Sequence, residues 1–355
     1  MQRGENMAGV TYKCPNCGAY LTFDPETQQW KCPFCSSAFP ETELKGKAEA
    51  FQKEADKEAE QSSGAQVVYH CPSCGSEIMT DETTVATHCY YCHSPVVLQG
   101  KLTADMKPDE VLPFTIGREK AIEEISEWIR TRKFVPKKFF SKAQIQEMSG
   151  VYYPHFVSEC QTEGVLDGEA TTSDVFDEGK YVVTNTRHYH VRREGRFVFK
   201  DILRPALSKA NRKLTEGVHP FPLENAKPFS GAFLSGFLAE RRDLEADSYR
   251  QEIEQELQGY MNSMLRDTAS QYQTCSASTT AAVKKIKTKY VLLPTWVLTY
   301  PNKKNKDEPY YYVMNGCTGQ VCGKLPVDMG RLWRHELLAG LIVAALFCVL
   351  AYFLF

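Results

Sequence analysis

Cysteine is the residue type in this sequence that is best placed to do chemistry. Eight of the 13 cysteines form Cys-x-x-Cys pairs, which fall into two blocks of one pattern, Cys-x2-Cys-x14-Cys-x2-Cys, displaced by 57 residues. Two blocks with identical spacing are very hard to obtain by chance, so one role is predicted for both. The first block contains Cys14, Cys17, Cys32 and Cys35, and the second contains Cys71, Cys74, Cys89 and Cys92.

Four thiolates at the corners of a tetrahedron form the ligand set of a structural zinc site. Each Cys-x-x-Cys turn presents two sulfurs, and the 14 intervening residues suffice for a hairpin that brings two turns together. Gly18 and Gly75 follow the first pair of each block, where a positive φ lets backbone amides turn toward the sulfurs. Because all four corners are protein ligands, no position remains for a catalytic water. The sequence therefore predicts two structural zinc ions.

Iron binding, redox chemistry and histidine ligands are the alternatives to two four-cysteine zinc sites. Iron in a rubredoxin-like site uses the same turns, and the sequence does not exclude it. A redox Cys-x-x-Cys does not normally come as four matched pairs. His70, His88 and His93 offer substitute ligands, but each block already has four cysteines. His188 and His190 stand two apart in a predicted strand without a third ligand, which favours surface or packing histidines over a metal site.

The charge distribution argues against a nucleic-acid-binding surface. Across 355 residues, Lys+Arg 42 and Asp+Glu 44 leave a net charge of −2. The second block has no Lys or Arg between its cysteines, and the first has only Lys31 between its two pairs. A phosphate-binding face needs a basic cluster. Protein binding is therefore the favoured role for both blocks.

No catalytic motif is recognisable. A phosphate-binding loop requires Gly-x4-Gly-Lys followed by Ser or Thr. The nearest candidate, Gly319–Leu325, is one residue short between its glycines and ends without a hydroxyl. Gly-x-Ser-x-Gly is absent, and no sequence pattern pairs two carboxylates for acid–base chemistry. We therefore expect no enzyme, with an unrecognised enzyme within 101–330 as a third alternative.

The elements that must position the cysteines are two zinc ribbons, at 11–40 and 67–100, joined by a charged linker at 41–66. This linker is either a solvated helix or a flexible tether. A β-rich α+β domain with helical inserts is predicted at 101–330. Its helices are expected at roughly Gly117–Arg132 and near Asp243–Thr268 from their apolar spacing. Strands are expected at Lys180–Thr184, His188–Lys200, Tyr290–Tyr300 and Tyr310–Met314.

A short internal echo lies within this domain. Val151–Phe156 and Val291–Trp296 both place Val first, Pro three residues later and an aromatic residue two positions after that. The two segments are 140 residues apart. The echo suggests two related half-domains.

The chain ends with an uncharged apolar stretch, Leu337–Phe355. At about 1.5 Å per residue it reaches roughly 28 Å, close to the roughly 30 Å hydrocarbon thickness of a bilayer. Arg331, Trp333 and Arg334 precede it, as is typical of an interfacial anchor. The sequence thus predicts a single-pass C-terminal transmembrane helix at 337–355, with the bulk of the chain on the cytoplasmic side of the cell membrane.

The chain resembles the bacterial TFIIB-type zinc-ribbon membrane proteins, a family sometimes labelled primosomal-protein-N′-like or helicase-like. The segments that carry the resemblance are Cys14–Cys17, Cys71–Gly75, Gly150–Pro154, Gly236–Glu240, Val291–Trp296 and Asn315–Val321. The family often has Gln in place of Cys317, so no function is assigned to that thiol. The resemblance implies a membrane-attached zinc-binding protein without a catalytic site. It also implies partners of the SPFH (flotillin-like) and phage-shock-protein-A-like kinds, which act in envelope stress.

These observations together predict a fold of two zinc ribbons, an α+β domain and a transmembrane helix. The predicted function is a tail-anchored, zinc-binding adaptor or scaffold that docks partner proteins at the cytoplasmic face of the membrane. The alternative is a membrane-tethered nucleic-acid-binding protein.

Overall fold

The computed structural model describes residues 12–44, 67–70, 77–80, 83–88, 95–97, 107–136, 148–300 and 310–354. These residues are mostly β-sheet with few helices, so the predicted α+β class is wrong. The physical reason lies in two long strands, β9 (Ser149–Glu178), which was not predicted, and β13 (Thr274–Tyr300), of which only Tyr290–Tyr300 was predicted. Both continue through polar stretches whose alternation is hard to recognise in sequence.

The described residues form three sheets. A three-stranded sheet surrounds the first cysteine block, and a two-stranded sheet belongs to the second block. The three-stranded sheet consists of β1 (Thr22–Asp24), β2 (Gln29–Lys31) and β3 (Ala38–Phe39). The two-stranded sheet consists of β4 (Val67–His70) and β5 (Glu77–Thr80). A ten-stranded sheet has the order β11-β8-β13-β9-β12-β6-β7, with β10 on β9, β14 on β13 and β15 on β14.

The shorter strands of the large sheet come from distant parts of the chain. They are β6 (Thr84–His88), β7 (Pro95–Val97), β8 (Glu110–Val111), β11 (Lys227–Pro228), β12 (Leu238–Glu240), β14 (Tyr310–Asn315) and β15 (Val321–Gly323). Because β6 and β7 flank the last cysteine pair of the second block, that block is joined directly to the large sheet. The predicted linker and the boundary at 101 fall largely outside the described residues and stay predictions.

The two echo segments occupy equivalent places at the centre of this sheet. They pair antiparallel with each other, with Tyr153 opposite Leu293. Val151 also pairs in parallel with β12, and Val291 pairs in parallel with β8. An approximate two-fold axis therefore relates the segments. That the whole domain consists of two related halves stays a prediction.

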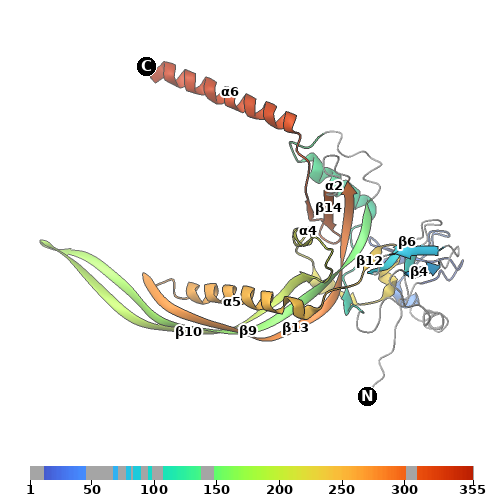
Figure 1. Cartoon of the computed structure of the whole chain (residues 1–355), viewed down its shortest axis with the longest axis horizontal. Coiled ribbons are helices and arrows are strands. Elements are labelled where there is room, and N and C mark those ends of the chain that lie inside the picture. The colour runs from blue at the N-terminus through green and yellow to red at the C-terminus, as the bar shows by residue number, and fades with distance from the viewer. Residues whose placement is uncertain are drawn as a thin grey trace.

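The long strands extend away from the rest of the chain and form a curved arm (Figure 1). The arm consists of β10 (Tyr181–Pro205) and the adjoining parts of β9 and β13, with helix α5 (Arg250–Asp267) lying along one face. The part of the chain around the arm's base, which includes both echo segments and the first cysteine block, is here called the body. One main core cluster fills the body and contains residues from 12 to 314.

Two helices confirm the predicted helical spacing. Helix α2 (Arg118–Arg130) buries Ala121 and Ile125 and ends before Pro136. Helix α5 buries Ile253, Leu257, Met261 and Leu265, which follow one another at four-residue intervals. Tyr260 and Met264 are exposed on the flank of the helix. Short helical turns complete the body at α4 (Arg212–Glu216), η3 (Leu223–Asn225), η4 (Gly231–Leu234) and η5 (Ala246–Tyr249).

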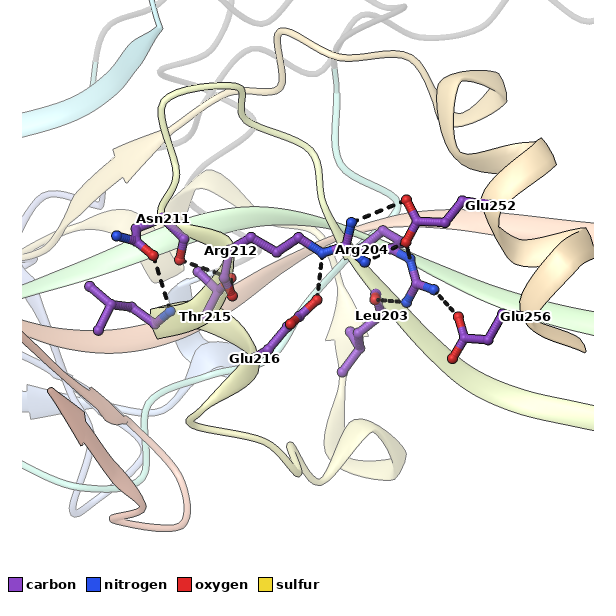
Figure 2. Close-up of polar contacts among 9 residues, drawn as sticks. Leu203, Arg204, Asn211, Arg212, Thr215, Glu216, Glu252 and Glu256 are labelled. Carbon is purple, nitrogen blue, oxygen red and sulfur yellow. Dashed lines mark hydrogen bonds and ion pairs between the residues drawn. The ribbon is translucent and has the colours of Figure 1, made fainter. Parts of the chain in front are cut away.

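A network of charged groups fixes α5 to the base of the arm (Figure 2). Arg204 of β10 forms ion pairs with Glu252 and Glu256 of α5. Arg212 of α4 binds the same Glu252 and also Glu216, with 2.6 Å between Arg212 Nε and Glu216 Oε1. The hydrogen bonds from Arg212 lower the pKa of Glu252. Three elements are thus held together at one point.

The C-terminal helix α6 (Met329–Leu354) projects from the body (Figure 1). Among the described residues, no helix is long and apolar enough to cross a membrane. The predicted anchor at 337–355 is therefore corrected, and with it the transmembrane part of the fold and the cell-membrane location.

Candidate metal centre

The first cysteine block forms two turns with the same backbone pattern. In the first turn the N–H of Cys14 donates to Ala19 O at 2.7 Å, and in the second the N–H of Cys32 donates to Ser37 O at 2.8 Å. Gly18 has φ +74, as predicted, and Ser36 at the matching place of the second turn has φ 59. The left-handed residue reverses the chain immediately after each pair, so that both sulfurs of a pair face the same side.

The two turns bring four sulfurs together. The Sγ atoms of Cys14, Cys17, Cys32 and Cys35 all lie within 4.8 Å of one another. The closest approaches join opposite turns, with 3.5 Å from Cys14 to Cys35 and 3.4 Å from Cys17 to Cys32. A zinc ion with bonds of about 2.3 Å to four sulfurs requires separations of roughly 3.8 Å between them. The geometry thus fits one tetrahedrally coordinated ion, as the sequence predicts for this block.

The four thiols differ in exposure and in acidity. Cys14 and Cys32 are buried, whereas Cys17 and Cys35 are exposed. Hydrogen bonds from the side chain and the backbone of Ser37 lower the pKa of Cys35 to about 6. The backbone N–H of Ala19 lowers the pKa of Cys17, but the neighbouring thiols and desolvation outweigh it and raise that pKa to about 12. Four negative sulfurs this close require a compensating charge, which a divalent cation supplies.

The strands between the cysteine pairs pack against the body. Trp30 of β2 is 1% exposed and lies at the centre of a ring cluster. Its ring centroid is 5.4 Å from that of Tyr12, 5.2 Å from that of Phe23 and 5.3 Å from that of Phe233, which belongs to η4. The ligands Cys14 and Cys32 lie in the same core cluster. The first block is therefore part of the body's core.

The cysteines of the second block, Cys71, Cys74, Cys89 and Cys92, lie outside the described residues. The strands beside them are described. His70 pairs with Glu77 across the first pair, and His88 pairs with Pro95 across the second. Lys31 pairs with Ala38 across Cys32 and Cys35 in the same way. In each case the residue before the first cysteine faces the third residue after the second.

The histidines considered as alternative ligands are described only in part. The side chains of His70, His88 and His93 fall outside the described residues. His188 and His190 are exposed on β10, and His190 Nε2 lies 3.1 Å from Asp167 Oδ1. Among the described residues, one group of three or more Cys, His, Asp or Glu has ligand atoms this close together, and it is the first cysteine block.

Two features of the centre were not predicted from the sequence. One is Ser37, whose hydroxyl is 3.3 Å from Cys35 Sγ. The other is the contact with η4, which lies about two hundred residues further along the chain. A signal for the second was present, because Trp30 is a large apolar side chain in a unit that is too small to bury it alone.

Comparison with known proteins gives one informative similarity. No protein-family model matches the chain, and no solved structure matches it. The chain is 28% identical over 338 residues to an uncharacterized protein, YdjG, of Bacillus subtilis (strain 168), and the alignment covers 94% of this chain and 96% of that protein. The two chains are thus similar over nearly their whole length.

Proposed function

We propose that this chain is a zinc-binding docking protein and that its metal centre is structural. The observation that carries the proposal is the gathering of four sulfurs within 4.8 Å of one another. A site in which all four ligands are protein sulfurs leaves no position for a reacting water. The role of the metal is therefore to fix the shape of the ribbon. Iron is the alternative occupant of such a site, and metal analysis distinguishes the two.

A second zinc ion is proposed at Cys71, Cys74, Cys89 and Cys92. The support comes from the strands on either side, because their register repeats that of the first block. In the first block, the strands with this register flank a turn that carries both cysteines of a pair. The identical spacing of the two blocks then brings two such turns within reach of one ion.

The outer end of the first ribbon offers a docking surface for a protein. Phe34 lies between the ligands Cys32 and Cys35 and is 77% exposed. The second block has an aromatic residue, Tyr91, at the corresponding position. Lys31, the basic residue between the cysteine pairs of the first block, forms an ion pair with Asp24. An apolar anchor without a basic cluster suits a protein partner better than nucleic acid.

The partners that the family resemblance implies, SPFH (flotillin-like) and phage-shock-protein-A-like proteins, are proposed as the first to test. In this proposal the chain has no catalytic role and serves as an adaptor or scaffold. Membrane anchoring forms no part of it.

Metal analysis of the purified full-length chain tests the centre. We expect two zinc equivalents per chain and a loss of one equivalent in Cys32→Ser. The control is Cys275→Ser, because Cys275 is an exposed thiol on β13, away from the cysteine block, and its loss should leave the metal content unchanged. Fewer than one equivalent in the unmodified chain, or an unchanged content in Cys32→Ser, would refute the proposal.

Binding of the two candidate partners tests the docking surface separately. Phe34→Ser should weaken binding at least tenfold while zinc is retained, because a buried aromatic anchor contributes on the order of 2 kcal/mol at an interface. Phe176→Ser is the matched control, since Phe176 is also exposed but lies on the arm. Equal binding by both variants would place the interface elsewhere.

A further inference from the structure

One segment of the body contacts both cysteine-bearing regions. It runs from Gly231 to Arg241 and is here called the docking segment. Its first half is η4 and the turn that follows, and its second half is β12. Its residues Gly236–Glu240 are among the segments that carry the family resemblance, which assigns them no role.

The first half of the docking segment forms a seat for the strands of the first ribbon. The indole N–H of Trp30 donates to Ala232 O at 3.0 Å, and the backbone N–H of Phe23 donates to Ser235 O at 2.9 Å. The Ser235 hydroxyl donates to the backbone carbonyl of Leu21. The ring of Phe233 lies 5.3 Å from that of Phe23. Polar groups at the centre of the ribbon are thus satisfied by this segment.

At Gly236 the backbone of the docking segment lies close to β1 of the first ribbon. This residue has φ +97, a conformation that side chains rarely adopt. A Cβ built at this position would lie 3.3 Å from Cβ of Thr22 in β1. Glycine therefore allows the chain both to turn and to lie against the ribbon.

The second half of the docking segment continues into the large sheet. Ala239 pairs with Ala86 of β6, and the N–H of Arg241 donates to Thr83 O at 2.8 Å. On its other side, Leu238 pairs with Val151 of β9. The docking segment is thus also fixed by its pairing in the large sheet.

We propose that the docking segment is a positioning element of the metal centre, which raises the affinity of Cys14, Cys17, Cys32 and Cys35 for zinc. This inference rests on the proposed zinc binding. Two of the four ligands, Cys14 and Cys32, are buried in the same core cluster as Ala232 and Phe233. Seating β1 and β2 therefore holds these ligands at the separations that a tetrahedral ion needs. By linkage, bound zinc in turn stabilises the seated ribbon.

Zinc affinity in a docking-segment variant tests the coupling. The measurement is competition with a chromophoric chelator, in the full chain with Cys71 and Cys89 replaced by Ser so that one centre reports. We expect Phe233→Ala to raise the zinc Kd about tenfold, within the usual range of coupling between sites. Phe221→Ala is the matched control, because Phe221 is a buried aromatic residue of a different cluster, and its Kd should stay unchanged. An unchanged Kd in Phe233→Ala would overturn the inference.

A milder variant and a second measurement cover the case in which Phe233→Ala does not fold. Ser235→Ala removes only the hydroxyl bond to Leu21 and should raise the Kd severalfold. In the unmodified chain, removal of zinc by a chelator should speed hydrogen exchange at 21–31 while exchange in the paired centre of β9 and β13 stays slow. Unchanged exchange at 21–31 after zinc loss contradicts the coupling. Absence of zinc from the purified chain contradicts the proposed function instead, so the two failures are distinguishable.

Discussion

The body and the arm of this chain bury apolar surface in different ways. In the body, segments from distant parts of the sequence enclose a core on all sides, with Trp30, Phe114 and Tyr152 almost fully buried. In the arm, a single sheet is covered on one face by α5, which packs on Cys160, Leu166 and Ala170 of β9. The body is thus a closed structure, whereas the arm has one solvated face.

The uncovered face of the arm carries cross-strand pairs of opposite charge. Asp167 and Glu163 of β9 point away from α5 and form ion pairs with Arg192 and Arg196 of β10, both at 3.1 Å. These side chains are largely exposed, so each pair contributes little to stability. Cross-strand pairs of opposite charge do favour the observed register, because a slip by one residue would place the charges under α5. Substitutions should therefore lower the free energy of unfolding strongly in the body and only slightly toward the end of the arm.

The largest effect is expected in the body at Trp30. Trp30→Ala removes a fully buried indole and leaves the Ala232 carbonyl without its donor, so unfolding should become easier by about 4 kcal/mol. Trp333→Ala is the control, because Trp333 is exposed on α6 and its loss should cost less than about 0.5 kcal/mol. The free energy of unfolding in urea, followed by circular dichroism, measures both. Equal losses would remove the distinction between closed and open packing.

Acid should destabilise the body through His155. Burial lowers the pKa of this side chain from 6.5 to about 4, and its Nε2 has no hydrogen-bond partner among the described residues. Since the unfolded chain binds a proton near pH 6.5 and the folded chain does not, stability is fully present above pH 6.5. It should fall between pH 6.5 and pH 4, by on the order of 3 kcal/mol.

Comparison of His155→Gln with His188→Gln checks this assignment. The first variant should flatten the decline of unfolding free energy between pH 6.5 and pH 4. The second should keep the decline, because His188 is exposed on the arm. A decline that persists in His155→Gln would assign the acid sensitivity to other groups of the body.

A smaller effect is expected where the arm joins the body. Arg204→Lys keeps the positive charge but loses the planar group that reaches both Glu252 and Glu256, and should cost about 1 to 2 kcal/mol. The reference variant is Arg250→Ala, which removes an exposed pair with Glu254 one helical turn apart and should cost less than about 0.5 kcal/mol. Thermal unfolding compares the two. A cost at Arg204 as small as that at Arg250 would show that the network does not fix α5.

Helices α2 and α5 and the gathering of the first four cysteines are the parts that the sequence predicts well. Helix α5 is recognisable because Ile253, Leu257, Met261 and Leu265 form a stripe at helical spacing. The four cysteines are recognisable because their chemistry depends on spacing that is visible in one dimension. Both signals are local, and neither depends on what lies opposite in space.

The long strands and the seat of the ribbon could not be predicted, because their causes are not local. In β9, glycines stand beneath α5 at Gly164 and Gly168, where a strand pattern usually has an apolar side chain. At Gly168 a Cβ would lie 2.3 Å from Cα of Ala277 in the neighbouring strand, so the glycine is needed for sheet packing although it resembles a turn signal. The seat joins Trp30 to Ala232, and nothing in either segment identifies the other.

The smallest effect is expected at the end of the arm. Beyond the pairing of Thr171 with Thr274, β9 and β10 continue as two strands alone, with Val175, Tyr181 and Val182 exposed. Tyr181→Ser should change the unfolding free energy by less than about 0.5 kcal/mol, because the 77% exposed ring loses little on truncation. Repeating the urea titration over a hundredfold range of protein concentration sharpens the comparison. A loss above about 1 kcal/mol that grows with concentration would mean that another copy covers this end, and the arm would then have a closed core of its own in the assembly.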